Sequence, residues 1–223
     1  MLRQAPVNFV LLVPLAAVTH MVTWRGWFAT EGGYARRWIE NEGGTPWQGL
    51  LSWVPYDWQN WWHYQALIYG YHVGESSPHP YQSNPLEWLF LVRPTLMHYE
   101  SFDDGTASTI LGVSNPLIWW GATAALGFLL VRTVLGLIAG RTVWADAFIL
   151  TGMLAGYVPW LMYLNRTVFQ FYTIAFEPFM VLALTAALAA LAGRRTDPER
   201  VRTPALVTVG AFLTLVVCVS AFF

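Results

Sequence analysis

The chain has 223 residues, of which 56% are hydrophobic, 16% aromatic and only 11% charged. A soluble globular domain carries about 25% charged residues, so this composition excludes an ordinary water-soluble enzyme. All 12 basic residues are arginines, and with 13 acids they give a net charge of −1, which argues against nucleic acid as a partner. A single cysteine, Cys218, excludes disulfide frameworks and thiolate metal clusters. The composition therefore predicts an all-α polytopic membrane protein.

Five charge-poor stretches are long enough to cross a bilayer, whose apolar core requires roughly 20 residues of helix. In chain order they are residues 4–24, 113–131, 147–165, 167–193 and 203–223. Glu177 and Pro178 interrupt the fourth stretch. We expect about five transmembrane helices that form a single membrane domain over residues 1–223, with a large aromatic-rich loop at residues 25–112.

Arginine placement predicts the orientation of these spans, because short cytoplasmic loops are enriched in arginine. Arg194, Arg195, Arg200 and Arg202 lie between the fourth and fifth spans, so that loop is predicted to be cytoplasmic. Alternation along the chain then places residues 25–112 and the carboxyl terminus on the extracytoplasmic side of the cell membrane.

The outer segment is rich in aromatic residues. Nine of the 13 tryptophans lie between Trp24 and Trp88, and tryptophan concentrates at the membrane–water interface. Residues 57–73 predict a helix with Asp57 as its amino-terminal cap, lying in the headgroup layer. Helical spacing gives it a broad aromatic face, formed by Trp58, Trp61, Trp62, Ile68 and Tyr69.

A proline-rich stretch follows this helix. Three prolines within eight residues exclude a regular helix or central strand over residues 76–88. Arg93 precedes Pro94, which favours extended geometry. A guanidinium beside hydroxyl, imidazole and amide groups suits a lipid-linked phosphate. The alternative is that Arg93 only snorkels to headgroups and the histidines cap loops. The residues with this chemistry are His79, Tyr81, Gln82, Ser83 and Arg93.

Two readings of Glu177 remain open. A carboxylate within a span faces a bundle interior or a water-filled cavity. If residues 166–176 are instead partly interfacial, Glu177 is shallow and hydrated. Elsewhere, Asp103 and Asp104 precede Gly105 and more simply form a solvated turn than a cation site. The histidines also lack the short spacing of a zinc site.

Several segments, taken together, resemble a known family. WHYQALIYGYH, SPHPYQSNPLEW, VRP, SNPLIWW, GYVPWLMYLNRTVFQFY and EPF occur in this order. They resemble the carboxyl-terminal half of the polyprenol-phosphate-mannose protein mannosyltransferases, most closely the actinobacterial type. The resemblance covers nearly the whole chain and implies part of a GT-C glycosyltransferase fold, with these five spans corresponding to the last five. Gln65 and Leu86 depart from the family pattern, which often has histidine and an aromatic residue there.

The resemblance implies transfer of mannose from a polyprenyl-phosphate donor to Ser or Thr of translocated proteins. It assigns Arg93 and Arg166 to the lipid phosphate, and His79, Tyr81 and Ser83 to the shape of the donor pocket. Tyr172 is expected to line the same cavity. Further pocket-lining candidates are His63, His72, Gln82 and Glu177.

The family's catalytic base belongs to an acidic pair in its first outer loop, and this sequence contains no counterpart of that pair. No catalytic residue is therefore assigned, and the chain is expected to require an amino-terminal half as a partner. No cofactor is assigned, and the sequence leaves open whether a divalent cation assists. The alternative function is a non-catalytic membrane subunit, or truncated remnant, that binds lipid or a partner protein. A transporter with an ion site at Glu177 would require paired broken helices, and only one interrupted span is present.

Overall fold

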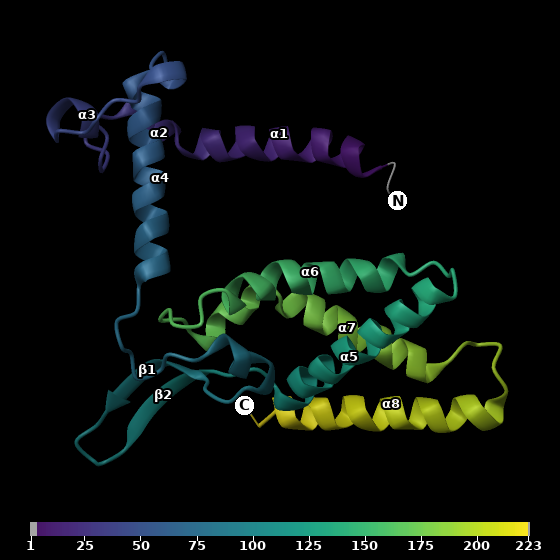
Figure 1. Cartoon of the computed structure of the whole chain (residues 1–223). Helices are drawn as coiled ribbons and strands as arrows, with labels where there is room; N and C mark the ends of the chain where they lie inside the picture. Colours follow the sequence, from purple (N-terminus) through teal and green to yellow (C-terminus); the bar gives the residue numbers. More distant parts are fainter. Residues whose placement is uncertain (1–3, 223) are drawn as a thin grey trace. The chain divides into compact units, whose positions relative to one another are not determined.

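The computed structural model describes residues 4–222 (Figure 1). The chain divides into two compact units, Met1–Gly74 and Glu75–Phe223. The first unit contains α1 (Ala5–Thr23), α2 (Arg25–Ala29), α3 (Trp38–Asn41), η1 (Gly49–Leu51) and α4 (Tyr56–Gly74). The second contains η2 (Pro85–Phe90), β1 (Thr95–Ser101), β2 (Ala107–Gly112), α5 (Pro116–Ile138), α6 (Trp144–Leu161), η3 (Gln170–Ala175), α7 (Glu177–Ala192) and α8 (Glu199–Ser220).

Within residues 4–222, three helical segments are long and apolar enough to cross a membrane. They are Pro6–Thr23 of α1, Pro116–Ile138 and Glu199–Ser220. The third and fourth predicted spans correspond to α6, with 18 residues, and α7, with 16 residues. The predicted class, an all-α polytopic membrane protein, is confirmed.

The helix of the predicted fourth span, residues 167–193, is shorter than expected, because α7 begins at Glu177 and the 3-10 helix η3 precedes it. Pro178 lies in the first turn of the helix, where the missing N–H has no helical partner to lose. Glu177 is partly exposed and lies where a carboxylate stabilises the helix dipole. The structure places Glu177 at the start of a helix, and both readings of its depth in the membrane stay predictions.

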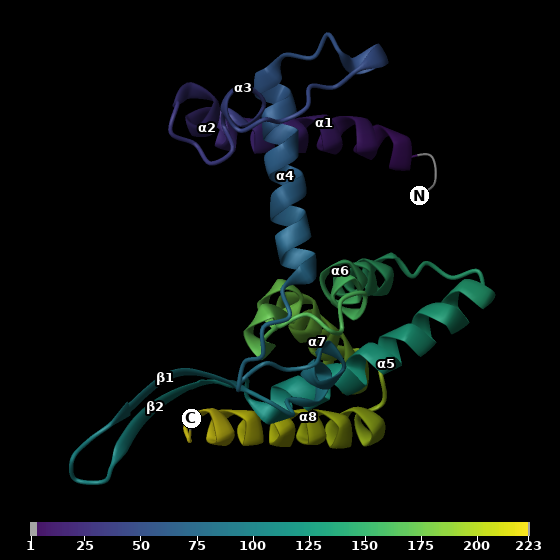
Figure 2. The same ribbon diagram turned by 60° about the vertical axis from the view of Figure 1, so that its left-hand side comes forward.

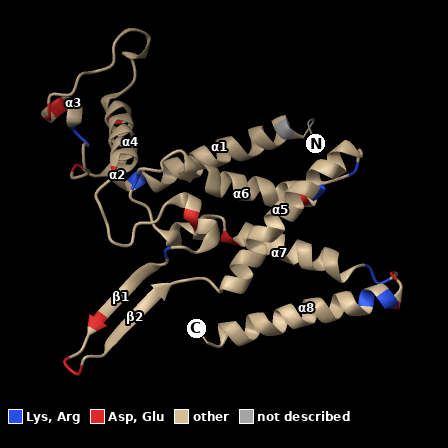
Figure 3. Cartoon of the chain, turned by 60° about the horizontal axis from the view of Figure 1, so that its bottom comes forward, with Lys and Arg blue, Asp and Glu red and all other residues tan. Residues whose placement is uncertain are grey.

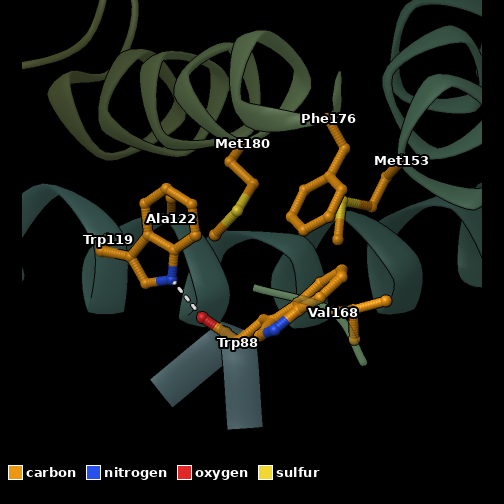
Figure 4. Packing of buried hydrophobic residues seen from close by; sticks show 7 residues of the cluster. All are labelled: Trp88, Trp119, Ala122, Met153, Val168, Phe176 and Met180. Carbon is orange, nitrogen blue, oxygen red and sulfur yellow. Dashed lines mark hydrogen bonds between the residues drawn. The ribbon is translucent and has the colours of Figure 1, made fainter. Parts of the chain in front are cut away.

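The core of the second unit includes a hydrophobic cluster that contains Trp88, which is fully buried. Trp88 lies on η2 and packs against Phe176, where α7 begins, and against residues of α5 and α6 (Figure 4). The Trp119 indole of α5 donates a hydrogen bond to the Trp88 carbonyl at 2.8 Å. Gly152 of α6 leaves room for Phe179 of α7, since a Cβ there would lie 2.1 Å from the phenyl ring. Helices α6 and α7 therefore pack closely against each other.

Asn115 joins the start of α5 to the end of α8. Its side-chain oxygen accepts a hydrogen bond from the Leu117 N–H at 3.0 Å and so caps α5. Its amide nitrogen donates to the Val216 carbonyl at 3.1 Å and to the Ser220 hydroxyl at 2.8 Å. Because α8 ends where α5 begins, these two helices run antiparallel, as the predicted alternation of spans requires.

A β-hairpin precedes α5, and the sequence analysis did not predict it. Strands β1 and β2 pair antiparallel and project away from the helices of their unit (Figure 2). The turn contains Asp104, whose carboxylate accepts hydrogen bonds from the Thr106 N–H at 2.9 Å and hydroxyl at 2.6 Å. These bonds hold the pKa of Asp104 below its ordinary value. The interpretation of Asp103 and Asp104 as a solvated turn agrees with this geometry.

Polar side chains of α4 connect this helix to the loops of the first unit. The buried residues of this helix are Gln59 and Asn60, while the predicted aromatic face includes the exposed Trp58 and Trp62. Gln59 accepts a hydrogen bond from the Trp47 N–H at 2.7 Å and donates to the Val54 carbonyl at 2.7 Å. The predicted helix is confirmed. Its buried amides hydrogen-bond to loop backbone, and its aromatic side chains pack on other rings of the first unit, such as Trp61 on Trp24 and Trp58 on Phe28.

Asp57 lies in the first turn of α4 and forms an ion pair with the buried Arg36. The Arg36 guanidinium also donates to the Phe28 carbonyl at 3.1 Å and lies 5.0 Å from the centre of the Trp27 ring. The predicted capping role of Asp57 is therefore replaced by a contact across the unit. Hydrogen bonding from Arg36 lowers the pKa of Asp57 below its ordinary value of 3.8.

This lowered pKa predicts acid sensitivity of the first unit. Ionised Asp57 stabilises the fold above the pKa that it has in the unfolded chain, and the contribution is lost as pH falls through the lower folded pKa. The Asp57 side chain is 45% exposed, so we expect a loss of only about 1 kcal/mol below about pH 4. Denaturant unfolding in detergent at several pH values measures it. Asp57→Asn should flatten the pH profile, whereas Glu31→Gln, at an exposed ion pair, should leave it in place.

Candidate functional site

Two loops that are distant in the sequence lie side by side in the second unit. The Thr167 N–H donates to the Glu75 carbonyl at 3.0 Å, and the Thr167 hydroxyl donates to the Ser77 carbonyl at 2.6 Å. The Ser83 N–H donates to the Val168 carbonyl at 2.9 Å. The proline-rich loop is therefore fastened along the segment that follows Arg166. This pairing brings the two predicted groups of donor-binding residues to the same end of the unit.

The proline-rich loop contains a tight turn at His79–Gln82. The Gln82 N–H donates to the His79 carbonyl at 3.0 Å, and the Gln82 side-chain oxygen accepts from the His79 N–H at 3.1 Å. The Tyr81 N–H donates to Nδ1 of His79 at 3.2 Å. Since Nδ1 accepts this hydrogen bond, the neutral imidazole carries its proton on Nε2. The exposed turn therefore presents an N–H donor on the His79 ring, whose centre lies 6.1 Å from the centre of the Tyr81 ring.

Arg93 follows η2 in the chain and contacts this turn. Its guanidinium donates to the Gln82 carbonyl at 3.2 Å, and the side chain is exposed. A guanidinium has five N–H donors in a fixed geometry, and this contact uses one of them. The structure thus places Arg93 beside the His79–Gln82 turn, as the sequence analysis proposed.

Arg166 immediately precedes residues 167–168, which pair with the proline-rich loop, and its guanidinium lies over an aromatic ring. The guanidinium carbon is 5.6 Å from the centre of the Trp160 ring, at the end of α6. Tyr172 of η3 packs against Trp160, with 5.0 Å between ring centres, and against Phe169 at 6.1 Å. The Phe169 ring in turn meets the His79 ring edge-on at 4.9 Å. A continuous aromatic surface therefore connects Arg166 to the turn that carries His79.

Ser83 occupies a different environment from the other loop residues. It is buried, and its hydroxyl oxygen accepts a hydrogen bond from the Trp88 indole at 2.8 Å. Together with its N–H bond to Val168, this contact fixes the end of the proline-rich loop onto the core. The contacts of Ser83 therefore hold the loop in position.

His63 and His72 lie on α4, in the first unit. The His63 ring stacks on Trp38, with ring centres 3.6 Å apart. The His72 ring meets Tyr71 edge-on at 5.5 Å. Both residues belong to the first unit, and their pocket-lining role stays a prediction.

Sequence reasoning missed two polar residues near this cluster, the buried Gln170 and the half-buried Tyr157. The Gln170 amide donates to the Trp88 carbonyl at 3.2 Å, and Tyr157 of α6 donates to the Pro85 carbonyl at 3.0 Å. These two hydrogen bonds join η2 to η3 and to α6. Gln170 lies within one of the quoted motifs, beside three aromatic residues. That position was the signal in the sequence that could have identified it. No group of three or more His, Cys, Asp or Glu side chains in the described part of the chain is arranged to hold a metal ion.

Comparison with known proteins adds independent evidence. A family model described as the "C-terminal four TMM region of protein-O-mannosyltransferase" matches residues 57–223. A polyprenol-phosphate-mannose–protein mannosyltransferase of Mycolicibacterium smegmatis is 29% identical over 231 residues, covering 97% of this chain and 43% of the relative. The proteins of that name from Mycobacterium tuberculosis and Corynebacterium glutamicum are each 27% identical over 216 residues, covering 92% of this chain and 40% of each relative. The chain thus spans less than half the length of these relatives. No solved structure matches it.

Proposed function

Because the chain belongs to the protein O-mannosyltransferase family, we propose that it forms the carboxyl-terminal part of a membrane mannosyltransferase. This enzyme transfers mannose from polyprenyl-phosphate-mannose to Ser or Thr hydroxyls of translocated proteins. The observation that carries the proposal is the pairing of the proline-rich loop with residues 167–168. It gathers cationic and hydrogen-bonding groups at one end of a bundle of membrane helices.

These groups match the charge that develops during the transfer. As the sugar leaves, negative charge grows on the polyprenyl phosphate, and preoriented donors stabilise it in the transition state. Arg93 and Arg166 supply fixed positive charge, and a guanidinium binds phosphate oxygens through two parallel N–H bonds. His79 and Tyr81 supply further donors. The general base that deprotonates the acceptor hydroxyl is assigned to no residue of this chain.

The orientation of the chain follows from its arginines. We place the donor-binding cluster, residues 25–112 and the carboxyl terminus on the extracytoplasmic side, within a single membrane domain. Arg132, Arg141 and the four arginines around the start of α8 lie near the opposite helix ends, and a cytoplasmic position for them satisfies the positive-inside rule. The lipid donor and the acceptor then meet on the extracytoplasmic side.

Replacing Arg93 or His79 by alanine tests this function. In the complete enzyme we expect each change to lower mannose transfer to an acceptor peptide by about tenfold, because each removes a donor to the leaving phosphate. The measurement is incorporation of labelled mannose from the lipid donor at equal enzyme concentration. Arg202→Ala and His98→Ala, which change the same residue types elsewhere, should leave transfer unchanged. Normal transfer by both site variants would contradict the proposed pocket.

A second candidate function is a non-catalytic membrane subunit that binds lipid or a partner protein. It rests on the hydrogen bond of Arg93 to the His79–Gln82 turn, which suits binding of an anionic lipid with or without transfer. Co-production with a candidate amino-terminal half, scored by mannose transfer, separates the two functions. Transfer that depends on both halves supports the enzyme, and its absence despite assembly supports the subunit.

A further inference from the structure

Arginines gather at the end of the second unit that lies opposite η2 and η3 (Figure 3). This end comprises the α5–α6 connection and the α7–α8 connection with the first turn of α8. Its basic residues are Arg132, Arg141, Arg194, Arg195, Arg200 and Arg202, and its acids are Asp146, Asp197 and Glu199. The excess of positive charge makes this end attractive to anions.

A cleft of about 860 Å³ opens at the α5–α6 connection. Its walls include the exposed apolar side chains of Phe128, Leu135 and Trp144, and its polar residues include Arg132, Arg141 and Asp146. Pockets that bind small molecules have volumes of about 300–1,000 Å³ and mostly apolar walls with a few polar groups. The cleft therefore has both the size and the composition of a binding site for an amphipathic molecule.

One of the two cleft arginines is already neutralised. Arg132 donates from Nε to one Asp146 carboxylate oxygen at 2.6 Å and from Nη2 to the other at 2.5 Å. Its guanidinium carbon also lies 5.0 Å from the centre of the Phe128 ring. Among residues 4–222 no ion pair involves Arg141. Arg141 is therefore the uncompensated charge of the cleft.

The backbone around Arg141 is held in place by the end of α5. Gly140 has a φ of +67°, and the Arg141 N–H donates to the Gly136 carbonyl at 2.8 Å, which closes the helix end. Gly136 lets the connection fold closely onto α5, since a Cβ there would lie 2.4 Å from a methyl carbon of Val143. The position of the Arg141 backbone is thus set before any ligand binds.

We propose that this cleft binds the phosphate group of an anionic phospholipid through Arg141. One acyl chain of that lipid lies along Phe128 and Leu135. The occupant is a lipid because the cleft lies at the end of a helix long enough to cross a membrane, where phospholipid headgroups surround the protein. Trp144 is 60% exposed, and exposed tryptophan at a helix end marks headgroup depth. Basic pockets between membrane helices bind anionic headgroups in this way.

The experiment measures lipid retained by the complete protein after extraction in mild detergent, using native mass spectrometry. Dioleoyl phosphatidylglycerol, dioleoyl phosphatidylcholine and inorganic phosphate are added separately. We expect the wild type to retain phosphatidylglycerol in preference to phosphatidylcholine, and Arg141→Gln to retain roughly fivefold less, the effect of one charge near an anionic lipid. Arg200→Gln makes the same charge change at this end outside the cleft and should retain as much as the wild type.

Three results would overturn the proposal. Equal loss in Arg141→Gln and Arg200→Gln would show a diffuse charge effect, and equal retention of the two lipids would show no headgroup recognition. Displacement of phosphatidylglycerol by inorganic phosphate would show that the acyl chain makes no contribution. Arg141→Lys preserves the charge and should still retain the lipid, so loss in that variant would also count against the site. None of these results depends on mannose transfer.

Discussion

Replacing Trp88 by alanine is expected to lower the free energy of unfolding of the second unit by about 3–5 kcal/mol. Trp88 is fully buried and packs against Phe176 at the junction of η3 and α7. The change removes this packing and leaves a cavity between four helical elements. It also leaves the buried Ser83 hydroxyl without its indole partner, which adds the cost of an unsatisfied polar group.

Unfolding titrations in detergent, followed by circular dichroism, measure this effect. Trp120→Ala is the matched control, because Trp120 is 53% exposed and donates one hydrogen bond to the Phe90 carbonyl at 3.1 Å. We expect that variant to lose about 1 kcal/mol. Equal destabilisation by the two changes would contradict this prediction.

The second large effect concerns Arg166. In the complete enzyme, Arg166→Ala is expected to lower kcat/KM for the lipid donor by about a hundredfold, the usual loss when one preoriented group that stabilises transition-state charge is removed. Trp160 supports its guanidinium, and Thr167 beside it is tied to Glu75 and Ser77. Because neighbouring groups hold Arg166 in place, its charge is already oriented before the leaving phosphate develops its own.

Kinetic measurements at varied donor and acceptor concentrations test this prediction. Arg166→Lys should recover part of the lost activity, since it restores the charge without the two-pronged geometry. Asn165→Ala, at the exposed neighbouring residue, should leave kcat/KM unchanged. If Arg166→Ala affects only KM for the acceptor peptide, the assignment to the donor phosphate is incorrect.

Much of the candidate site was predictable because its residues lie close together in the sequence. His79, Tyr81 and Gln82 lie on one proline-rich stretch, and Pro94 separates Arg93 from the strand that follows. Their chemistry suits a lipid-linked phosphate, with snorkelling of Arg93 to headgroups as the alternative, and the resemblance assigned Arg93 to the phosphate. The structure places Arg93 against the carbonyl of Gln82. The role of Ser83 was harder to predict from the sequence, because its contacts with Trp88 and Val168 depend on the folded core.

Two features of the helices could not be predicted, for a shared physical reason. The predicted fourth span began at residue 167, because hydropathy and charge along the chain do not show where a helix begins, whereas α7 begins at Glu177, after η3. The aromatic periodicity of α4 predicted an aromatic face, but it did not show that Gln59 and Asn60 are the buried residues. Their burial depends on the backbone of loops up to 24 residues away in the sequence.

The amino-acid sequence by itself determined the membrane class, the positions of the apolar helices and the family, because hydropathy, charge and ordered motifs are properties of short segments. Only the tertiary structure decided which loops meet, which polar side chains are buried, and that residues 75–83 lie along residues 167–168. The β-hairpin also appears only in the folded chain. Those features rest on hydrogen bonds and packing between segments far apart in the chain, and such contacts form only when the whole unit folds.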